Sequence, residues 1–104
     1  MLQGLPMIEI RDSSLLLDSC LVDGAWVKSV SKKTMKVTNP ATGAEVGEVP
    51  ELSKSEIEIA IASAYTSQKH WAQLPARERS AVLRSWFNLI LENVEDLAVI
   101  MTVE

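Results

Sequence analysis

The residues that could carry out chemistry in this chain are few, and they form no recognisable catalytic set. The single cysteine, Cys20, lies in an apolar run typical of a β-strand, and the single histidine, His70, lies near the predicted end of a helix. A nucleophilic cysteine needs a nearby base, usually a histidine that a third polar group orients. The sequence places no such group beside Cys20, so we expect a small buried side chain there and a helix-terminal position for His70.

The glycine pattern predicts a turn rather than a phosphate-binding loop. Gly43 and Gly47 stand in "VTNPATGAEVGEVP" with the spacing G-x-x-x-G, which differs from the dinucleotide-binding and P-loop patterns. Asn39 and Pro40 favour a β-turn, because proline fixes its φ angle and the asparagine side chain can bond to its own backbone. We therefore expect a corner between two strands, with Gly47 marking a bulge in the second strand.

Composition and charge exclude several classes of function. The chain has 104 residues, of which 47% are hydrophobic and 23% charged, a balance typical of globular rather than disordered chains. The net charge is −4 and there is no basic stripe, so nucleic acid is not an expected partner. In "LPARERSAVLRSWF" the arginines are offset by Glu78. No apolar run is long enough to span a membrane, and a lone cysteine without a signal-peptide pattern favours a cytoplasmic location.

The first half of the chain predicts strands. Two apolar runs flank Asp23 and Gly24, a dipeptide that favours a type I′ turn because both central residues of that turn need positive φ angles. Further strand candidates, "TMKVT" and "AEVGEVP", lie on either side of "NPATG". A short helical turn opened by a serine is expected before them, at residues 13–19. Together these segments predict a β-meander over about residues 20–50.

The second half changes to a helical period. Ser53 and Glu56 match a capping box, and Pro75 both breaks one helix and suits the start of the next. We predict helices at about residues 53–70, 75–93 and 95–104. The first helix carries an apolar stripe that we expect to be buried, formed by Ile57, Ala60, Ile61, Ala64 and Trp71.

The end of the chain differs from an ordinary helix end. "LAVIMTVE" is strongly apolar, has no glycine cap and finishes on Glu104, whose charge opposes the helix dipole. We expect from this pattern a chain that is cut within a larger structure.

Several of these strings occur together, in the same order, in one enzyme family. "LVDGAWV", "NPATG", "ARER", "RSWFNLILEN" and "DLAVIMTVE" resemble the N-terminal portion of the NAD(P)-dependent aldehyde dehydrogenases, and most closely their succinate-semialdehyde dehydrogenase branch. The resemblance implies an α/β fold with a Rossmann-type cofactor domain in the full-length parent. Residues 13–104 would then be a truncated N-terminal part of that cofactor-binding domain, and residues 1–12 a flexible tail.

The resemblance also implies which parts of the enzyme this chain does not contain. In the family, the nucleophilic cysteine, the general-base glutamate and the cofactor-binding segments lie beyond the matched part, and Cys20 corresponds to none of them. We therefore expect no catalytic and no cofactor-binding residue here, and NAD or NADP would bind only the full-length parent. That parent would be a homo-oligomer that oxidises an aldehyde, with succinate semialdehyde as the expected substrate. The expected partner of this chain is the remainder of the fold.

Two further points concern binding. By the same resemblance, the backbone carbonyls of Val37 and Thr38 are candidate ligands for a monovalent cation, because some relatives hold a cation at this position.

A stand-alone, non-enzymatic interaction or oligomerisation module is the alternative to an enzyme segment. Apolar helix faces favour that alternative, because a missing partner leaves them exposed; they include Trp71, Trp86, Phe87 and Ile100.

Overall fold

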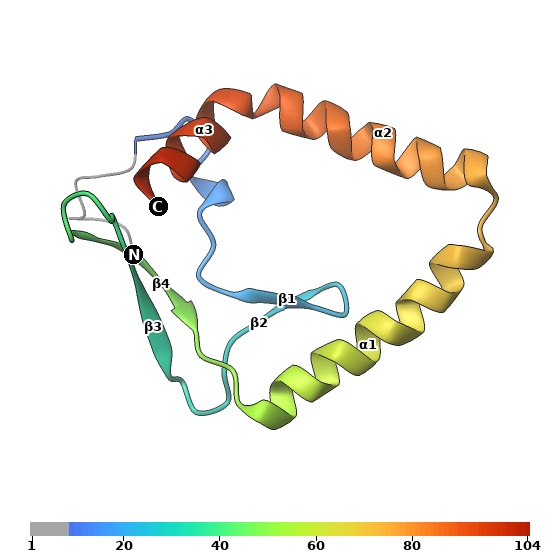
Figure 1. Cartoon of the computed structure of the whole chain (residues 1–104), viewed down its shortest axis with the longest axis horizontal. Helices are drawn as coiled ribbons and strands as arrows, with labels where there is room; N and C mark the ends of the chain where they lie inside the picture. Colours follow the sequence, from blue (N-terminus) through green and yellow to red (C-terminus); the bar gives the residue numbers. More distant parts are fainter. Residues whose placement is uncertain (1–8) are drawn as a thin grey trace.

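The computed structural model describes residues 9–104, which form one short 3-10 helix, four strands and three α-helices (Figure 1). The 3-10 helix η1 spans Ser13–Leu15, and the strands β1 to β4 span Cys20–Val22, Ala25–Val27, Thr34–Thr38 and Glu45–Pro50. The helices α1, α2 and α3 span Lys54–Gln73, Ala76–Glu92 and Val94–Val103. The predicted order, strands and then helices, is confirmed. Most of the tail predicted at residues 1–12 lies outside the described residues.

The strands form two separate antiparallel hairpins. β1 pairs with β2 and β3 pairs with β4, whereas β2 and β3 are not paired within the described residues. The predicted run of strands is therefore present as two hairpins rather than one continuous sheet. The first hairpin turns at Asp23 and Gly24, whose φ angles of 51° and 74° are both positive. A type I′ turn requires these angles, so the prediction from the Asp-Gly dipeptide is confirmed.

The second hairpin turns at "NPATG". The Asn39 N–H donates to the Ala44 carbonyl at 2.8 Å, and the Gly43 N–H donates to the Asn39 carbonyl at 2.7 Å. The Asn39 side-chain oxygen accepts from the Ala41 N–H at 2.9 Å, which is the predicted side-chain-to-backbone bond. Gly43 has a φ angle of 75°, in the left-handed region that favours glycine. The segment is the structural corner expected from its sequence.

A bulge lies in β4, next to Gly47. Val37 pairs with Gly47 but Thr38 pairs with Glu45, so Val46 has no residue opposite it on β3. An extra residue of this kind bends the strand and re-aims its side chain. Val46 is only 3% exposed, which indicates that the bulge turns this valine toward the small core. The bulge was predicted at Gly47, whereas the extra residue is Val46, one position earlier.

The helices begin and end at the expected capping and proline residues. The Ser53 hydroxyl accepts from the Glu56 N–H at 3.2 Å, and the Glu56 carboxylate accepts from the Ser53 N–H at 2.9 Å, which confirms the capping box. α1 continues past its predicted end at residue 70 as far as Gln73. It ends there because Leu74 precedes a proline and takes an extended conformation, with ψ of 143°. Pro75 is then the N-cap of α2.

The segment before η1 is attached to α3. Asp96 is 7% exposed, and its two carboxylate oxygens accept hydrogen bonds from the N–H groups of Arg11 at 2.8 Å and Asp12 at 3.0 Å. The two segments lie side by side in Figure 1. Asp12 also caps η1, because its side chain accepts from the Ser14 N–H at 3.0 Å. An aspartate therefore provides the cap that the sequence assigned to a serine.

The chain has little core for its length. Its Cα radius of gyration is 16.6 Å, whereas a compact domain of this length has about 13 Å. Its accessible surface of 8212 Å² exceeds that of a typical folded monomer of this size by about 2,400 Å². Full exposure of residues 1–8 would account for at most about 1,300 Å² of this excess. The elements form an open frame, with α1 and α2 along two of its sides (Figure 1).

The apolar stripe that was expected to be buried on α1 is not buried in this chain. Ile57 and Ile61 are 46% and 63% exposed, and neither α1 nor α2 contains a buried residue. Within residues 9–104, α1 makes no extensive contact with α2 or with either hairpin, and helix-to-helix packing is concentrated between α2 and α3. The helical period was predicted correctly. The prediction of burial was wrong because no other described element covers the stripe.

Candidate functional site

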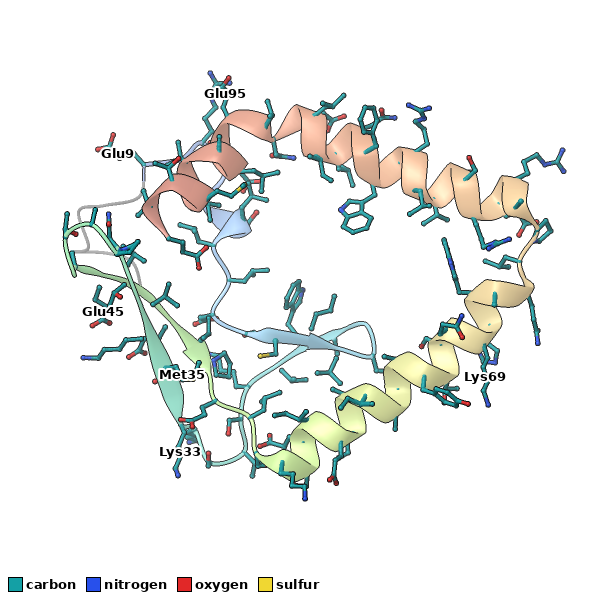
Figure 2. The ribbon with its side chains drawn as sticks, viewed as in Figure 1. Glu9, Lys33, Met35, Glu45, Lys69 and Glu95 are labelled. Carbon is teal, nitrogen blue, oxygen red and sulfur yellow. The ribbon has the colours of Figure 1, made fainter. Side chains whose placement is uncertain are left out.

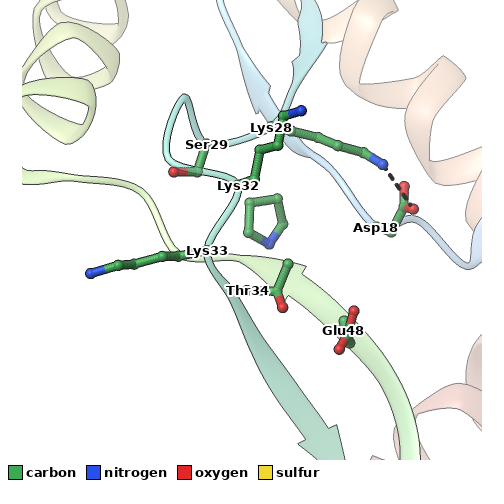
Figure 3. A pocket seen from close by; sticks show the side chains of 8 residues that line it. Asp18, Lys28, Ser29, Lys32, Lys33, Thr34 and Glu48 are labelled. Carbon is green, nitrogen blue, oxygen red and sulfur yellow. Dashed lines mark hydrogen bonds and ion pairs between the residues drawn. The ribbon is translucent and has the colours of Figure 1, made fainter.

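A pocket of about 430 Å³ lies where the segment between β2 and β3 meets β4 (Figure 3). Three lysines and two carboxylates supply its charged lining, and two hydroxyl residues and a proline complete it. The lining residues are Asp18, Lys28, Ser29, Lys32, Lys33, Thr34, Glu48 and Pro50.

One lysine of this pocket is already paired. The Nζ of Lys28 lies 3.3 Å from Oδ2 of Asp18, the ion pair drawn as a dashed line in Figure 3. The hydrogen bond from Lys28, and secondly its positive charge, lower the pKa of Asp18 below its usual value. Both side chains are more than half exposed. Because solvent screens such pairs, this one has a small effect on stability.

The buried hydroxyl of the pocket is engaged in hydrogen bonds. Ser29 is 4% exposed, and its Oγ lies 2.8 Å from the Oγ of Ser31 and 3.5 Å from Oε1 of Glu56. A nucleophilic serine needs a base positioned to take its proton. The single histidine, His70, lies instead in the last turn of α1, at the opposite end of that helix from Glu56. Ser29 therefore has a structural role, holding the loop after β2.

Glu56 is the carboxylate that joins this loop to α1. Besides capping the helix, it accepts a hydrogen bond from the Val30 N–H at 3.1 Å through Oε2. Hydrogen bonds from the backbone N–H of Ser53, and then from that of Val30, lower the pKa of Glu56 below its usual value. A carboxylate stabilised in its ionised form is poorly suited to exchange protons near neutral pH. Its position favours a structural role rather than a catalytic one.

The sequence-derived candidates for covalent chemistry lie apart from this pocket. Cys20 is the first residue of β1, opposite Val27, and is half-buried rather than buried as expected, because only part of the hairpin is covered. His70 is exposed at the end of α1, as expected. Among residues 9–104, no cluster of three or more His, Cys, Asp or Glu side chains could hold a metal ion. Neither Cys20 nor His70 lines the pocket.

Two of the three arginines of "LPARERSAVLRSWF" contact groups within or beside their own helix. The Nε of Arg79 donates to the Leu74 carbonyl at 3.1 Å, and the guanidinium of Arg84 lies 5.2 Å from the centre of the Phe87 ring. Glu78 stands in the same first turn of α2. This arrangement does not resemble the free basic face that a phosphate backbone requires.

Val37 and Thr38, the candidate cation ligands, lie at the register shift of the second hairpin. The regular pairing of β3 with β4 is interrupted between these two residues, and a bulge leaves backbone groups near it outside the regular ladder. Val37 is half-buried and Thr38 is exposed. Among residues 9–104, no group of three or more His, Cys, Asp or Glu side chains at this position could hold a metal ion.

Two polar contacts of this structure were not predicted from the sequence. Asp96 and Ser29 are its buried polar residues, and their partners include groups 85 and 27 positions away. Asp96 is one of two acids in the first turn of α3, which is a weak signal. No local pattern marks either residue as a long-range contact.

Within residues 9–104, no helix combines the length and the hydropathy needed to cross a bilayer.

Comparison with known proteins identifies relatives across nearly the whole chain. Residues 26–104 match the model of the aldehyde dehydrogenase family. The chain is 43% identical to the 3-sulfolactaldehyde dehydrogenase of Pseudomonas putida and 42% identical to a glutarate-semialdehyde dehydrogenase of Pseudomonas aeruginosa. It is 38% identical to the NADP(+) succinate-semialdehyde dehydrogenase of Escherichia coli. These alignments cover 93–94% of this chain and 20% of each relative.

Solved structures are similar to this chain over nearly the same share of its length. An aldehyde dehydrogenase from Brucella melitensis biovar abortus matches 93% of this chain with a TM-score of 0.87 and 44% sequence identity, and the match covers 20% of that protein. The present chain thus spans about a fifth of the length of its relatives. Since the family model matches most of the sequence and the fold follows a solved member over 93% of the chain, the chain belongs to the aldehyde dehydrogenase family.

Proposed function

We propose that this chain forms the N-terminal segment of a semialdehyde dehydrogenase, which oxidises an aldehyde to a carboxylic acid with NAD or NADP as hydride acceptor. The observation that carries the proposal is the structural match over 93% of the chain, at a TM-score of 0.87 and 44% identity. Agreement of this extent covers both hairpins and all three helices, so it supports a shared position in the fold rather than a shared local motif.

The names of the relatives support one class of substrate. The relatives act on 3-sulfolactaldehyde, glutarate semialdehyde and succinate semialdehyde, according to their names. Each of these is a short aldehyde that carries a sulfonate or carboxylate group. We therefore propose a short aldehyde with an anionic group as the substrate, with succinate semialdehyde as the first compound to test.

The proposal assigns the chemistry to the remaining four fifths of the enzyme. Gly24 and Gly43 lie in the two hairpin turns and Gly47 lies in β4, and the start of α1 is capped by its own Ser53 and Glu56, so these residues do not fit the phosphates of a nicotinamide dinucleotide. Such a cofactor supplies hydride transfer once it is bound. We propose that this chain places its strands and helices beside the part of the enzyme that binds the cofactor.

We also propose domain bounds, a cation site, an oligomeric state and a cellular location for the parent enzyme. Residues 13–104 would be part of the cofactor-binding domain and residues 1–12 a tail. The carbonyls of Val37 and Thr38 would contribute to a monovalent-cation site, which the interrupted pairing of β3 and β4 supports. The parent would be a homo-oligomer of the cytoplasm, a location that the lone Cys20 favours.

A chimera tests the segment's place in the enzyme. Residues 1–104 are joined to the part of the P. putida 3-sulfolactaldehyde dehydrogenase that follows its matched fifth, and reduction of NAD(P) is followed with 3-sulfolactaldehyde. We expect turnover by the chimera and none by the same relative with its first fifth deleted. A folded chimera without turnover would contradict the proposal.

The substrate class is tested on the full-length parent of this chain. Succinate semialdehyde is compared with butanal, which has the same number of carbon atoms and no carboxylate. We expect a higher kcat/KM for succinate semialdehyde, and a preference for butanal would show that the substrate class is wrong.

A further inference from the structure

The segment between β2 and β3 is basic, although the chain as a whole is acidic. Residues 28–33, "KSVSKK", hold three lysines and no acidic residue, whereas the chain has a net charge of −4. In Figure 2 Lys33 marks this segment at one end of the second hairpin, and Glu45 lies at the other end. All three lysines line the pocket beside β4. Among residues 9–104, Lys28 is the one of the three that forms an ion pair.

Lys32 has an unusual backbone conformation. Its φ angle is 63°, in the left-handed region where a side chain is crowded against the backbone. The other described residues with a positive φ angle are Asp23, Gly24 and Gly43, which are residue types that tolerate this region. Lysine is not one of these types. Backbone strain of this kind is concentrated at functional sites, where the surrounding contacts hold it in place.

Hydrogen bonds hold the segment in this conformation. The Lys32 N–H donates to the Ser29 carbonyl at 3.0 Å, and the Lys33 N–H donates to Oγ of Ser31 at 3.3 Å. The Lys33 carbonyl accepts from the Glu51 N–H at 2.9 Å. The segment is thus fixed before a ligand binds, so binding would lose little conformational entropy.

Two of the lysines have donors available to a ligand in the pocket. In Figure 3 the side chain of Lys32 extends toward Lys28, whereas that of Lys33 extends away from the pocket. An ammonium group has three N–H donors, and Asp18 accepts from one of those of Lys28. Lys32 forms no ion pair within residues 9–104. The other acid of the pocket, Glu48, is exposed on β4.

We propose that this pocket binds a small organic phosphate, with the phosphate group held by the ammonium groups of Lys28 and Lys32. Lysine binds phosphate as a point charge, and a phosphate monoester carries close to two negative charges near neutral pH. One such group therefore matches two ammonium groups. The inference is independent of the proposed function, because all of the residues that carry it lie in the described chain.

The size and remaining lining of the pocket favour an organic phosphate over the free ion. Its volume of about 430 Å³ lies in the range of small-molecule sites and exceeds what a phosphate group fills. The buried Pro50 and the exposed Thr34 line the part of the pocket away from Lys28. An apolar ring and a hydroxyl residue suit a short carbon skeleton that carries hydroxyl groups.

NMR titration tests the site. The isotope-labelled 104-residue chain is titrated at constant ionic strength with glycerol 3-phosphate, inorganic phosphate and glycerol. We expect saturable shifts of the amides of residues 29–34 with glycerol 3-phosphate, binding of inorganic phosphate that is roughly tenfold weaker, and no shifts with glycerol. Shifts that do not saturate, or that are spread over lysines outside the pocket, would overturn the site. Equal affinity for the two phosphates would overturn the organic ligand and assign the site to the free ion.

Matched substitutions test the role of Lys32. Lys32→Gln removes the charge and keeps most of the side chain, and Lys32→Gly also relieves the unfavourable φ angle. We expect each to weaken binding of glycerol 3-phosphate roughly tenfold or more, because each removes a hydrogen bond to a charged group. Lys54→Gln makes the same charge change on α1, outside the pocket, and should keep the wild-type affinity. Wild-type affinity in both Lys32 variants would overturn the assignment.

Hydrogen exchange of the amide at position 32 separates binding from folding. This amide donates to the Ser29 carbonyl, so its protection reports whether the turn is formed. Because glycine has no penalty in the left-handed region, we expect exchange in Lys32→Gly to be at least as slow as in the wild type. Intact protection with lost binding would support a binding role for Lys32. Faster exchange in Lys32→Gly, with wild-type affinity in Lys32→Gln, would give Lys32 a structural role and overturn the proposal.

Discussion

Glu56 and Val30 are 26 positions apart and are joined by a hydrogen bond of 3.1 Å from the Val30 N–H to Oε2 of Glu56. The other oxygen of the same carboxylate accepts from the Ser53 N–H at 2.9 Å. One ionised side chain therefore caps α1 and holds the loop that follows the first hairpin. We therefore expect the orientation of this loop relative to the helix to depend on the charge of Glu56.

The attachment made by Glu56 is expected to weaken in acid. Because folding lowers the pKa of Glu56, its stabilising contribution is fully present above the ordinary glutamate pKa of about 4.3 and is lost as the pH falls through the lower value in the folded chain. NMR titration of the Glu56 carboxyl carbon and of the Ser53 and Val30 amides measures this. Glu56→Gln should abolish the transition of both amides, whereas Glu58→Gln should leave it. Amide shifts that do not follow the Glu56 titration would contradict the prediction.

Asp96→Ala is expected to release the segment before η1 from α3. The substitution leaves the N–H groups of Arg11 and Asp12 without their acceptor, and each lost bond to a charged group is worth about 1.5–3 kcal/mol. We expect hydrogen exchange of these two amides to accelerate at least roughly tenfold. Glu95→Ala, at the exposed neighbouring acid, is the control and should leave the exchange unchanged. Equal rates in the wild type and Asp96→Ala would refute the role of Asp96.

Gly43→Ala is expected to destabilise the second hairpin through the backbone alone. A side chain at this position would have no atom within 4 Å, but the φ angle of 75° is unfavourable for alanine, by about 1–2 kcal/mol. Gly43→Asn should lose less, because asparagine tolerates the left-handed region better. Thermal unfolding of the chimera carrying each variant measures the order Gly, Asn, Ala. An alanine variant as stable as the wild type would show that the turn relaxes to another conformation.

Lys28→Met is expected to return the pKa of Asp18 toward its ordinary value. The hydrogen bond and charge of Lys28 are the main causes of the lowered pKa, and both groups are exposed. NMR titration of Asp18 should therefore show an upward change in the variant, and a smaller change in the same direction when salt is added to the wild type. Lys54→Met, which removes the partner of Glu58, should not affect Asp18.

The local features of this fold could be predicted from the sequence because each depends on residues within a few positions of one another. The turn at Asp23 and Gly24, the cap formed by Ser53 and Glu56, and the break before Pro75 are all of this kind. Their backbone angles and hydrogen bonds are set by the residues themselves. The family could also be predicted from the sequence, because its ordered strings are matched by the family model and by the solved relatives.

The features that depend on distant residues were decided only by the tertiary structure. Nothing near Asp96 in the sequence indicates that its carboxylate binds the backbone of Arg11, and the pairing of β3 with β4 is what turns Val46 inward. The helical period marked Ile61 as a packing residue, but a period reports only which side chains share a face. Whether that face is buried depends on what packs against it, and among residues 9–104 no element covers it.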